Sequence, residues 1–350
     1  MHSQQLTEPQ FTQPSDLVRW LGAVQAQDYG AAKWALGLRL PGSSDDAIDQ
    51  VFNDGAILRT HVMRPTWHFI LPEDIRWMLE LTAPRVNQLS AYYYRRLALD
   101  DALFARSNDV IVKALEGGKQ LTREELIAAL DAAGIHSEEL LRSTYIIGRA
   151  ELDALICSGG RRGKQFTYAL IAERAPTAKS LPRDEALATL TARYFRSHGP
   201  ATLKDYSWWS GLTSADCKAG LEMIKRQLAS EVIDGDTYWF ADDARIDRPL
   251  DPAVYLLPNY DEYMVAYTDR SAMYDTQHDS KLDSRGNVLF NNVVVLDTRV
   301  VGIWKRTLKK ASVIVTPTLF APLDDAQMDA LAAAAQRYAD FLGLKLELVI

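Results

Sequence analysis

The order of apolar stripes, helix caps and turns along the 350-residue chain predicts one supersecondary unit three times. The third copy is the clearest. Thr202 caps a short helix that Gly211 ends, and a second helix places apolar residues at helical spacing from Cys217 to Leu228. The pair Asp234-Gly235 between two short apolar runs then predicts a β-hairpin. Helix, turn, helix and hairpin in this order are typical of a winged helix-turn-helix.

The second copy follows the same order. Thr122 begins a capping box that opens one helix, and a second helix is expected from about Leu141 to Leu155. The hairpin that follows has a glycine-rich basic tip over residues 158–164. Such a tip can lie along a phosphate backbone, although a flexible surface turn explains the composition equally well.

The first copy is degenerate. An apolar stripe runs from Leu17 to Val24 at the i, i+3, i+4, i+7 spacing of a core-facing helix. Ser44 caps a further helix, and residues 57–62 and 66–70 predict a hairpin around the turn Met63-Arg64-Pro65. A helical linker over about residues 73–97 joins this copy to the second.

The chain changes character from about Val254. Strands are expected at residues 254–257, 288–296, 300–304 and 313–315, followed by a helix over 328–342 and a terminal strand over 344–350. The fold class is therefore α+β, with three tandem winged helix-turn-helix motifs followed by a β-rich α+β C-terminal domain. The expected boundaries are 8–72, 105–175 and 183–241 for the winged helices, 73–104 for the linker and 252–350 for the last domain.

Composition fits an ordinary globular protein, with 47% apolar and 24% charged residues. No apolar run is long enough to span a membrane, and the N-terminus lacks the pattern of a signal peptide. Cys157 and Cys217 are sixty residues apart and predict neither a disulfide framework nor a zinc site. The six histidines show no ligand spacing, so no metal is expected. A reducing, cytoplasmic setting follows.

The net charge of −7 argues at first against a nucleic-acid partner. However, residues 231–262 hold nine acidic and two basic side chains, so this window carries the whole excess. Residues 299–323 carry five basic and no acidic residues, and residues 81–99 carry three arginines and no acid. Each cluster can be an ordinary solvated face. It indicates nucleic-acid binding only if it lies on a structural element that contacts a polyanion.

The candidate site with the most chemical interest is the string Gln25-Ala26-Gln27-Asp28, with Gly30 as a helix stop. On an α-helix, residues i and i+2 point about 200° apart. The two glutamines can therefore share a site only if the helix ends or distorts there. On spacing alone, two solvated glutamines at a helix end are the simpler interpretation.

The string Ala23-Val24-Gln25-Ala26-Gln27-Asp28 is similar to the Gln-x-Gln motif of the AlkZ/YcaQ-type winged-helix DNA glycosylases. Further segments resemble the same family, in the same order and across nearly the whole chain. They are Leu58 to His68, Gly199 to Thr202 with Trp208 to Leu212, Leu256 to Tyr263, and Val300 to Arg306. As a series in this order, the segments are fairly specific for the family.

The resemblance implies a DNA repair enzyme that hydrolyses the N-glycosidic bond of N-alkylated purines, including interstrand crosslinks. It implies that Gln25 and Gln27 position the hydrolytic water. A crosslink-unhooking branch has Asp at the second position, so Gln27 makes this chain look closer to the azinomycin-resistance branch. Asp28 and the hairpin residues His61 and His68 are candidate supporting groups.

The chemistry is consistent with amides in place of acids. Ordinary glycoside hydrolysis uses two carboxylates, one of which protonates the leaving group. An N7-alkylated guanine is already cationic and leaves as a neutral base. A lyase step would need an activated amine, and no lysine lies between Met1 and Gln27. We therefore expect a monofunctional glycosylase without cofactor.

Double-stranded DNA carrying alkylated bases is the expected partner of a monomer associated with the nucleoid. His68 can equally be a satisfied core histidine, and the pair Trp208-Trp209 is more typical of core than of base stacking. Expected DNA contacts are Arg59, Arg64, Thr66, Arg161, Arg162, Lys164, Arg299, Lys305 and Arg306.

Two other functions remain open at this point. A non-catalytic winged-helix DNA-binding protein, such as a transcriptional regulator, would keep the fold without the chemistry. A protein-interaction scaffold fits the acidic balance but gives the basic hairpins no role.

Overall fold

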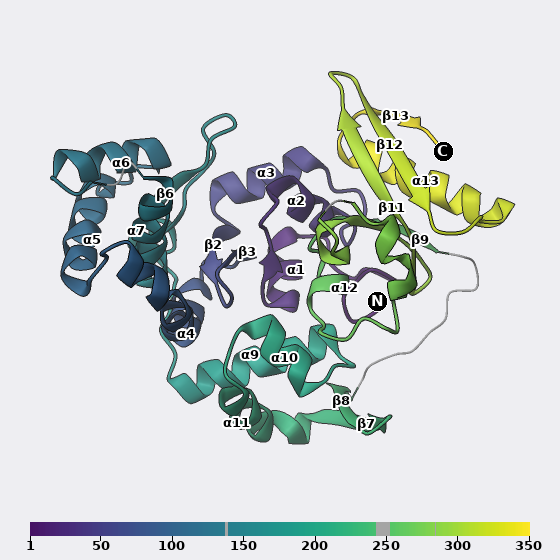
Figure 1. Cartoon of the computed structure of the whole chain (residues 1–350), viewed down its shortest axis with the longest axis horizontal. Helices are drawn as coiled ribbons and strands as arrows, with labels where there is room; N and C mark the ends of the chain where they lie inside the picture. Colours follow the sequence, from purple (N-terminus) through teal and green to yellow (C-terminus); the bar gives the residue numbers. More distant parts are fainter. Residues whose placement is uncertain (137–138, 243–252, 284) are drawn as a thin grey trace.

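The computed structural model describes residues 1–136, 139–242, 253–283 and 285–350 and shows three units of one topology. In the first unit the chain order α1-β1-α2-α3-β2-β3 folds into a sheet with strand order β1-β3-β2, and the second unit gives β4-β6-β5. The third unit pairs β7 with β8, and its first strand is reduced to a bridge between Ala201 and Trp239. These are the predicted winged helices (Figure 1).

The first unit departs from the predicted helix boundaries at the candidate motif. Gly22 adopts a φ of 83° and ends α1, so the apolar stripe stops short and Val24 belongs to β1. Gly30 was expected to stop a helix but lies in the first turn of α2, which the sequence analysis missed. The hairpin is as predicted. The elements are α1 (Pro14–Leu21), β1 (Val24–Gln25), α2 (Tyr29–Gly37), α3 (Asp45–Asp54), β2 (Leu58–Val62) and β3 (Thr66–Ile70).

The long helix α4 (Ile75–Arg96) lies where the helical linker was expected and leads into the second unit. Thr122 and Glu125 form the predicted capping box at the start of α6. The hairpin β5–β6 carries the glycine-rich tip. The elements are α5 (Asp101–Leu115), β4 (Leu121–Thr122), α6 (Arg123–Ala132), α7 (Leu140–Leu152), β5 (Ile156–Ser158), β6 (Thr167–Leu170) and the short α8 (Ile171–Arg174).

The third unit follows the prediction because its signals are local, except that its second helix ends at Ile224 and Leu228, expected on that helix, begins a strand. Thr202 and Asp205 form a capping box, Gly211 ends α10 at a φ of 70°, and Thr213 caps α11. The Asp234-Gly235 turn has both φ angles positive, as this hairpin type requires. The elements are α9 (Arg183–His198), α10 (Leu203–Ser210), α11 (Ser214–Ile224), β7 (Leu228–Ile233) and β8 (Asp236–Ala241).

The C-terminal region forms a five-stranded sheet of order β13-β12-β11-β10-β9, antiparallel except for the β12–β13 pair. One expected strand was too long, because Val288–Phe290 is a turn of 3₁₀-helix. The elements are β9 (Val254–Leu257), α12 (Glu262–Val265), β10 (Asn292–Leu296), β11 (Arg299–Leu308), β12 (Ser312–Leu319), α13 (Asp325–Phe341) and β13 (Lys345–Leu348), with further 3₁₀ turns at Lys225–Gln227 and Thr276–Lys281.

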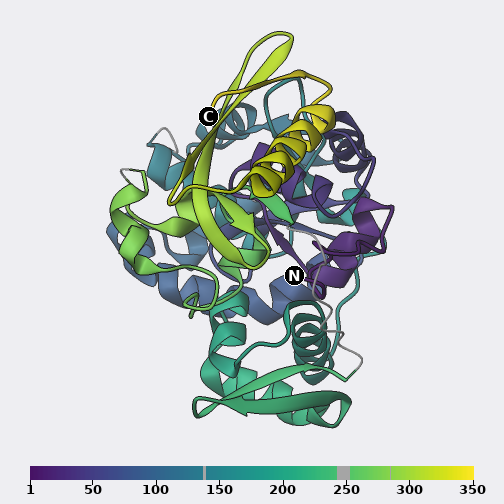
Figure 2. The same cartoon turned by 90° about the vertical axis from the view of Figure 1, so that its right-hand side faces the viewer.

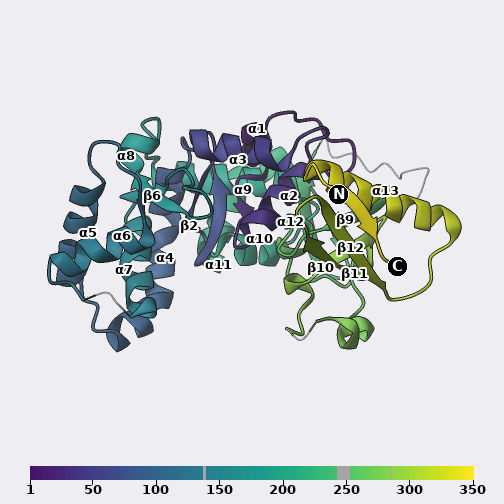
Figure 3. The ribbon, with the colours of Figure 1, turned by 90° about the horizontal axis from the view of Figure 1, so that it is seen from above.

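The first unit lies at the centre of the molecule (Figure 1). The second unit lies to one side of it, the third below it, and the C-terminal sheet on the other side. Figure 2 shows α13 against the C-terminal sheet, and Figure 3 shows the second unit and this sheet at opposite ends of the long axis. Among the described residues, no helix is both long and apolar enough to cross a membrane.

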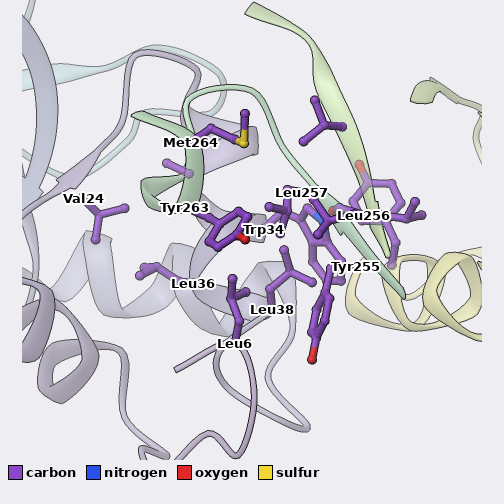
Figure 4. Close-up of a cluster of buried hydrophobic side chains, with 14 of the residues drawn as sticks. Leu6, Val24, Trp34, Leu36, Leu38, Tyr255, Leu256, Leu257, Tyr263 and Met264 are labelled. Carbon is purple, nitrogen blue, oxygen red and sulfur yellow. The ribbon is translucent and has the colours of Figure 1, made fainter. Parts of the chain in front are cut away.

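The first unit and the C-terminal sheet share one hydrophobic core. Figure 4 shows Trp34 and Leu36 of α2 among side chains of β9 and α12. The Trp34 indole N–H donates to the carbonyl of Leu256 at 2.7 Å. Arg39 and Asp261 form a fully buried ion pair at 2.8 Å beside this core. One acid of the −7 window, Asp261, is therefore an internal structural group rather than surface charge.

The remaining acids of that window are of three kinds, and the first of these, Glu231, Asp234, Asp236 and Asp242, are exposed on or beside the β7–β8 hairpin. Glu262 is also buried, and its contacts belong to the site described below. Asp243, Asp247 and Asp251, together with Arg245, Arg248 and the expected domain start at residue 252, lie outside the described residues. The boundaries of the domains remain a prediction.

Candidate active site

Gln25 is the last residue of strand β1 in the first unit's sheet, and Gln27 follows two residues later in a bend. Gln25 pairs with His68 of β3, and the Ala26 N–H donates to the Trp67 carbonyl at 2.7 Å. Both side chains accept hydrogen bonds from the same β2–β3 hairpin, unlike residues i and i+2 of a helix, which point about 200° apart. The condition set by the sequence, that the helix must end before the two glutamines can share a site, is met by Gly22.

The two side-chain amides are held by donors from the β2–β3 hairpin. Arg64 donates to Gln25 Oε1 at 2.8 Å, and the Trp67 N–H donates to Gln27 Oε1 at 3.3 Å. An amide oxygen has two lone pairs, so each keeps one acceptor position. Gln25 is buried, with 6% of its surface exposed, whereas Gln27 is exposed. The pair therefore spans the boundary between interior and solvent.

Glu262 lies directly behind Gln25; in the sequence it belongs both to the acidic window and to the segment Leu256 to Tyr263 that resembles the family. Its Oε1 accepts the Gln25 backbone N–H at 2.9 Å, and its Oε2 accepts the Trp209 indole N–H at 2.9 Å. His198 Nε2 lies 3.2 Å from the same oxygen. Burial raises the pKa of this carboxyl, but the bonds and electrostatic attraction of His198, with the Gln25 N–H, outweigh it and hold the pKa below its ordinary value.

His68 lies on β3 opposite Gln25 and is almost completely buried. Its Nδ1 lies 2.9 Å from the carbonyl oxygen of Thr66, which can only accept, so Nδ1 carries the proton. Nε2 is then an acceptor, and within the part of the chain that the structure describes it has no hydrogen-bond partner. Burial, and next the charge of Arg64, lowers the pKa of His68 to about 3. The imidazole is therefore neutral at neutral pH. Of its two ring nitrogens, Nδ1 is hydrogen-bonded and Nε2 is not, among the described residues.

The low pKa of His68 predicts a pH-dependent stability. Its folded pKa of about 3 lies below its ordinary 6.5, so the unfolded chain binds more protons between these values and stability falls as the pH drops. Between pH 6.5 and 5 the loss is about 2 kcal/mol. His68→Asn keeps a donor for Thr66 but cannot titrate. Urea unfolding at both pH values should show a loss larger by about 2 kcal/mol in the parent than in the variant, and equal losses would contradict it.

Arg59 fixes the backbone between the two glutamines. Its Nε donates to the Ala26 carbonyl at 3.0 Å, and its guanidinium lies 4.1 Å from the Trp67 ring and 4.6 Å from the Phe166 ring. Burial lowers the pKa of Arg59 to about 10, which still leaves it cationic at neutral pH. Phe166 belongs to the second unit's hairpin, so that unit contacts the motif through this stack.

Arg64 is positioned by the third unit as well as by its own hairpin. Gly211 packs so closely on the β2–β3 turn that a Cβ there would lie 2.8 Å from the Met63 carbonyl oxygen. Arg64 also lies 5.2 Å from the ring of Trp208. Trp208 is 41% exposed whereas Trp209 is fully buried. The interpretation of these two tryptophans as core thus holds for Trp209 and is wrong for Trp208.

The other candidate supporting groups are already engaged. Asp28 caps α2 by accepting the Ala31 N–H at 3.0 Å, and Arg306 lies 3.7 Å from its other oxygen. His61 Nδ1 lies 2.6 Å from Glu151, and its ring lies tilted against the Trp67 ring, with the two centroids 3.9 Å apart. Thr66, a predicted DNA contact, has a buried hydroxyl with no hydrogen-bond partner among the described residues.

The predicted DNA contacts divide into two groups. Arg59, Arg64 and Arg306 lie around the motif, and Arg161 reaches it through Tyr29 at 5.0 Å while pairing with Asp49. The others do not touch the motif: Arg162 pairs with Glu125 at 2.7 Å, Lys164 is exposed at the β5–β6 tip, Lys305 is exposed on β11, and Arg299 lines a separate pocket with Arg270 and Asp275.

The sequence analysis missed four residues that organise the motif: Glu262, Trp209, His198 and Phe166. Only Glu262 and Trp209 carried a signal, since both stand in or beside the segments quoted for the family resemblance. Within the described part of the chain, no group of three or more His, Cys, Asp or Glu side chains is arranged to hold a metal ion.

The structure combines three winged-helix units with two oriented side-chain amides, those of Gln25 and Gln27. A model of the AlkZ-like DNA glycosylase family matches residues 18–341, so the chain belongs to this family of hydrolases acting on N-glycosyl bonds. An interstrand DNA cross-link repair glycosylase of Streptomyces sahachiroi is 28% identical over 330 residues, which cover 89% of this chain and 87% of that protein. The solved structure of Streptomyces sahachiroi DNA glycosylase AlkZ has a TM-score of 0.80 at 21% identity, covering 99% of this chain and 96% of the other.

Proposed function

We propose that this glycosylase hydrolyses the N-glycosidic bond of cationic N-alkylated purines, such as N7-alkylguanine, in double-stranded DNA. The observation that carries the proposal is the pair of amide oxygens of Gln25 and Gln27 at the end of β1, each held by one donor and each free to accept another. A water that donates to both oxygens would be oriented for attack on the deoxyribose. The same dipoles would stabilise the positive charge that develops on the sugar.

The positions of the nearby acids support a cationic leaving group. Glu262 is buried and accepts bonds from Gln25, Trp209 and His198, and Asp28 caps a helix. Neither is arranged as a free acid that could protonate a departing base. An N7-alkylated guanine needs no such proton, because it leaves as a neutral molecule.

The same geometry supports simple hydrolysis without strand cleavage. Lys33 is the lysine nearest to the motif in sequence, and it is buried in ion pairs with Asp45 at 2.6 Å and Asp49 at 3.1 Å. A paired ammonium is a poor nucleophile for a Schiff base. We therefore infer a monofunctional enzyme that leaves an abasic site.

Bulky adducts and interstrand crosslinks are further proposed substrates. The Streptomyces relative bears the name of a cross-link repair glycosylase. Gln27 is exposed, so the outer half of the amide pair is open to solvent and does not require a base to enter a tight pocket. One chain holds all three winged helices and both glutamines, so a monomer is sufficient. A cytoplasmic, nucleoid-associated protein would meet this substrate.

Base release from a duplex containing N7-methylguanine tests the proposal. Release by the parent protein that is lost in Gln25→Ala and Gln27→Ala supports it. Tight binding without release, insensitive to both changes, would instead identify a non-catalytic DNA-binding protein.

DNA affinity should depend on Lys164. This side chain is exposed at the β5–β6 tip, and within the described ranges it has no hydrogen-bond or ion-pair partner, whereas Arg162 is paired with Glu125. If Lys164 neutralises one phosphate, Lys164→Ala should make the plot of log affinity against log salt shallower by about 0.9. Lys345→Ala, on the exposed face of β13, is the matched control and should leave the slope unchanged. Equal slopes in the parent and both variants would show that the β5–β6 tip is not part of the DNA interface.

A further inference from the structure

Glu262 is a buried carboxylate that the proposed chemistry does not use. It begins the short helix α12, which lies between the first unit and the C-terminal sheet (Figures 1 and 3). Its side chain is 1% exposed, and both oxygens are engaged. One oxygen accepts from β1 and the other from α10, with His198 of α9 beside it. Burying a carboxylate is costly unless such partners compensate, so its position needs a reason.

The bond from Gln25 supplies that reason. β1 is only two residues long, and its backbone pairs with β3 on one side. The Gln25 N–H is fixed by Glu262 at 2.9 Å while the Gln25 side chain is fixed by Arg64 at 2.8 Å. The backbone N–H of Gln25 is thus held by an anionic side chain and its side-chain oxygen by a cationic one. Two such anchors on one residue define where its amide oxygen points.

Joining the domains does not by itself require this carboxylate. The neighbouring Asp261 already ties α12 to the first unit through its buried ion pair with Arg39 at 2.8 Å. Asp261 also accepts the Tyr263 N–H at 2.9 Å and so caps the helix. None of its bonds reaches the motif. Asp261 therefore provides the same kind of interdomain link without the contact to Gln25.

We propose that Glu262 is a positioning residue for base release, which holds Gln25 in its working orientation through the backbone N–H. This inference rests on the proposed function of Gln25. It assigns Trp209 and His198 to the support of the carboxylate rather than to contact with DNA. The third unit thereby acts on the motif of the first unit through Glu262.

The test compares Glu262→Gln with Asp261→Asn, its equally buried neighbour. A glutamine cannot accept at both ends, so one N–H of Gln25 or Trp209 loses its partner whichever way the amide turns. Single-turnover release of N7-methylguanine and affinity for the same duplex are measured below the melting temperature of each variant. We expect Glu262→Gln to be about 10- to 100-fold slower in release at unchanged affinity. Asp261→Asn should lose thermal stability and keep the release rate within about two-fold.

A second pair of variants leaves both carboxylates in place and covers the case in which either carboxylate variant fails to fold. Trp209→Phe removes one donor from Glu262, and Trp304→Phe removes an equivalent buried indole bond, to the Leu257 carbonyl at 2.9 Å. Only Trp209→Phe should slow release. If the release rates of the Glu262 and Asp261 variants fall in the same proportion to their losses in melting temperature, the positioning role is overturned. The same holds if Trp209→Phe and Trp304→Phe slow release equally. A parent protein that releases no base would instead overturn the proposed function itself.

Discussion

Replacing Gln25 by alanine is expected to slow the release of N7-methylguanine from duplex DNA by about 10²- to 10³-fold. The change removes an amide oxygen that Arg64 orients and that lies in a nearly dry position, with 6% of Gln25 exposed. A preorganised dipole in such a site stabilises developing charge far more than the same group would in water. The measurement is single-turnover release at saturating enzyme, so that a change in DNA binding does not enter the rate.

Gln27→Ala should act in the same direction, because the Trp67 N–H orients its oxygen in the same way. The matched control is Gln50→Ala, which changes an exposed glutamine on α3 of the same unit whose side chain donates to Asp54. Its rate should equal that of the parent. Full activity in Gln25→Ala would show that the water is held elsewhere.

The second large effect concerns the leaving group. Uracil and undamaged guanine should be released at least about 10²- to 10⁴-fold more slowly than N7-methylguanine from the same sequence context, which is the factor that a general acid ordinarily contributes. Asp28 and Glu262 are both committed to hydrogen bonds within the fold. Neither should protonate a neutral base as it leaves.

The comparison is made with three duplexes of identical sequence that differ at one base. Comparable release of uracil would mean that a proton donor acts in the site. Asp28→Asn would then identify or exclude the carboxylate nearest to the glutamines in sequence.

The repeated units could be predicted because their signals are local. Thr122 and Thr202 cap their helices through side chains three residues apart, and Asp234-Gly235 forms its turn from its own backbone preferences. None of these needs a distant part of the chain. The class of fold therefore followed from spacing, and the family comparisons agree with it.

The exact course of the chain through the motif could not be predicted in the same way. Val24 has the spacing of a helical stripe, yet Gly22 ends α1 and tertiary pairing with β3 makes Val24 a strand residue. Helix α2 is buried from Ala31 to Gly37, so it presents no alternation of apolar and polar faces. A stripe detects helices with one solvated face and misses those buried on every side.

The surroundings of Gln25 depend on residues far along the chain. Glu262 is 237 positions away and Trp209 belongs to another unit, so no spacing could place them beside the motif. The charge pattern was misleading for the same reason. Asp261 and Glu262 belong to the acidic window in the sequence, whereas each is buried against partners in the first or third unit.

Released base from an N7-methylguanine duplex, measured for the parent protein and for the double variant Gln25→Ala/Gln27→Ala, tests the paired-amide site most directly. Both proteins are first shown to bind the duplex with equal affinity and to melt at equal temperature. We predict that the parent releases free N7-methylguanine and leaves an uncleaved abasic strand, while the double variant binds the duplex and releases almost none. Equal release by both proteins, or binding without release by the parent, would contradict hydrolysis by the two glutamines.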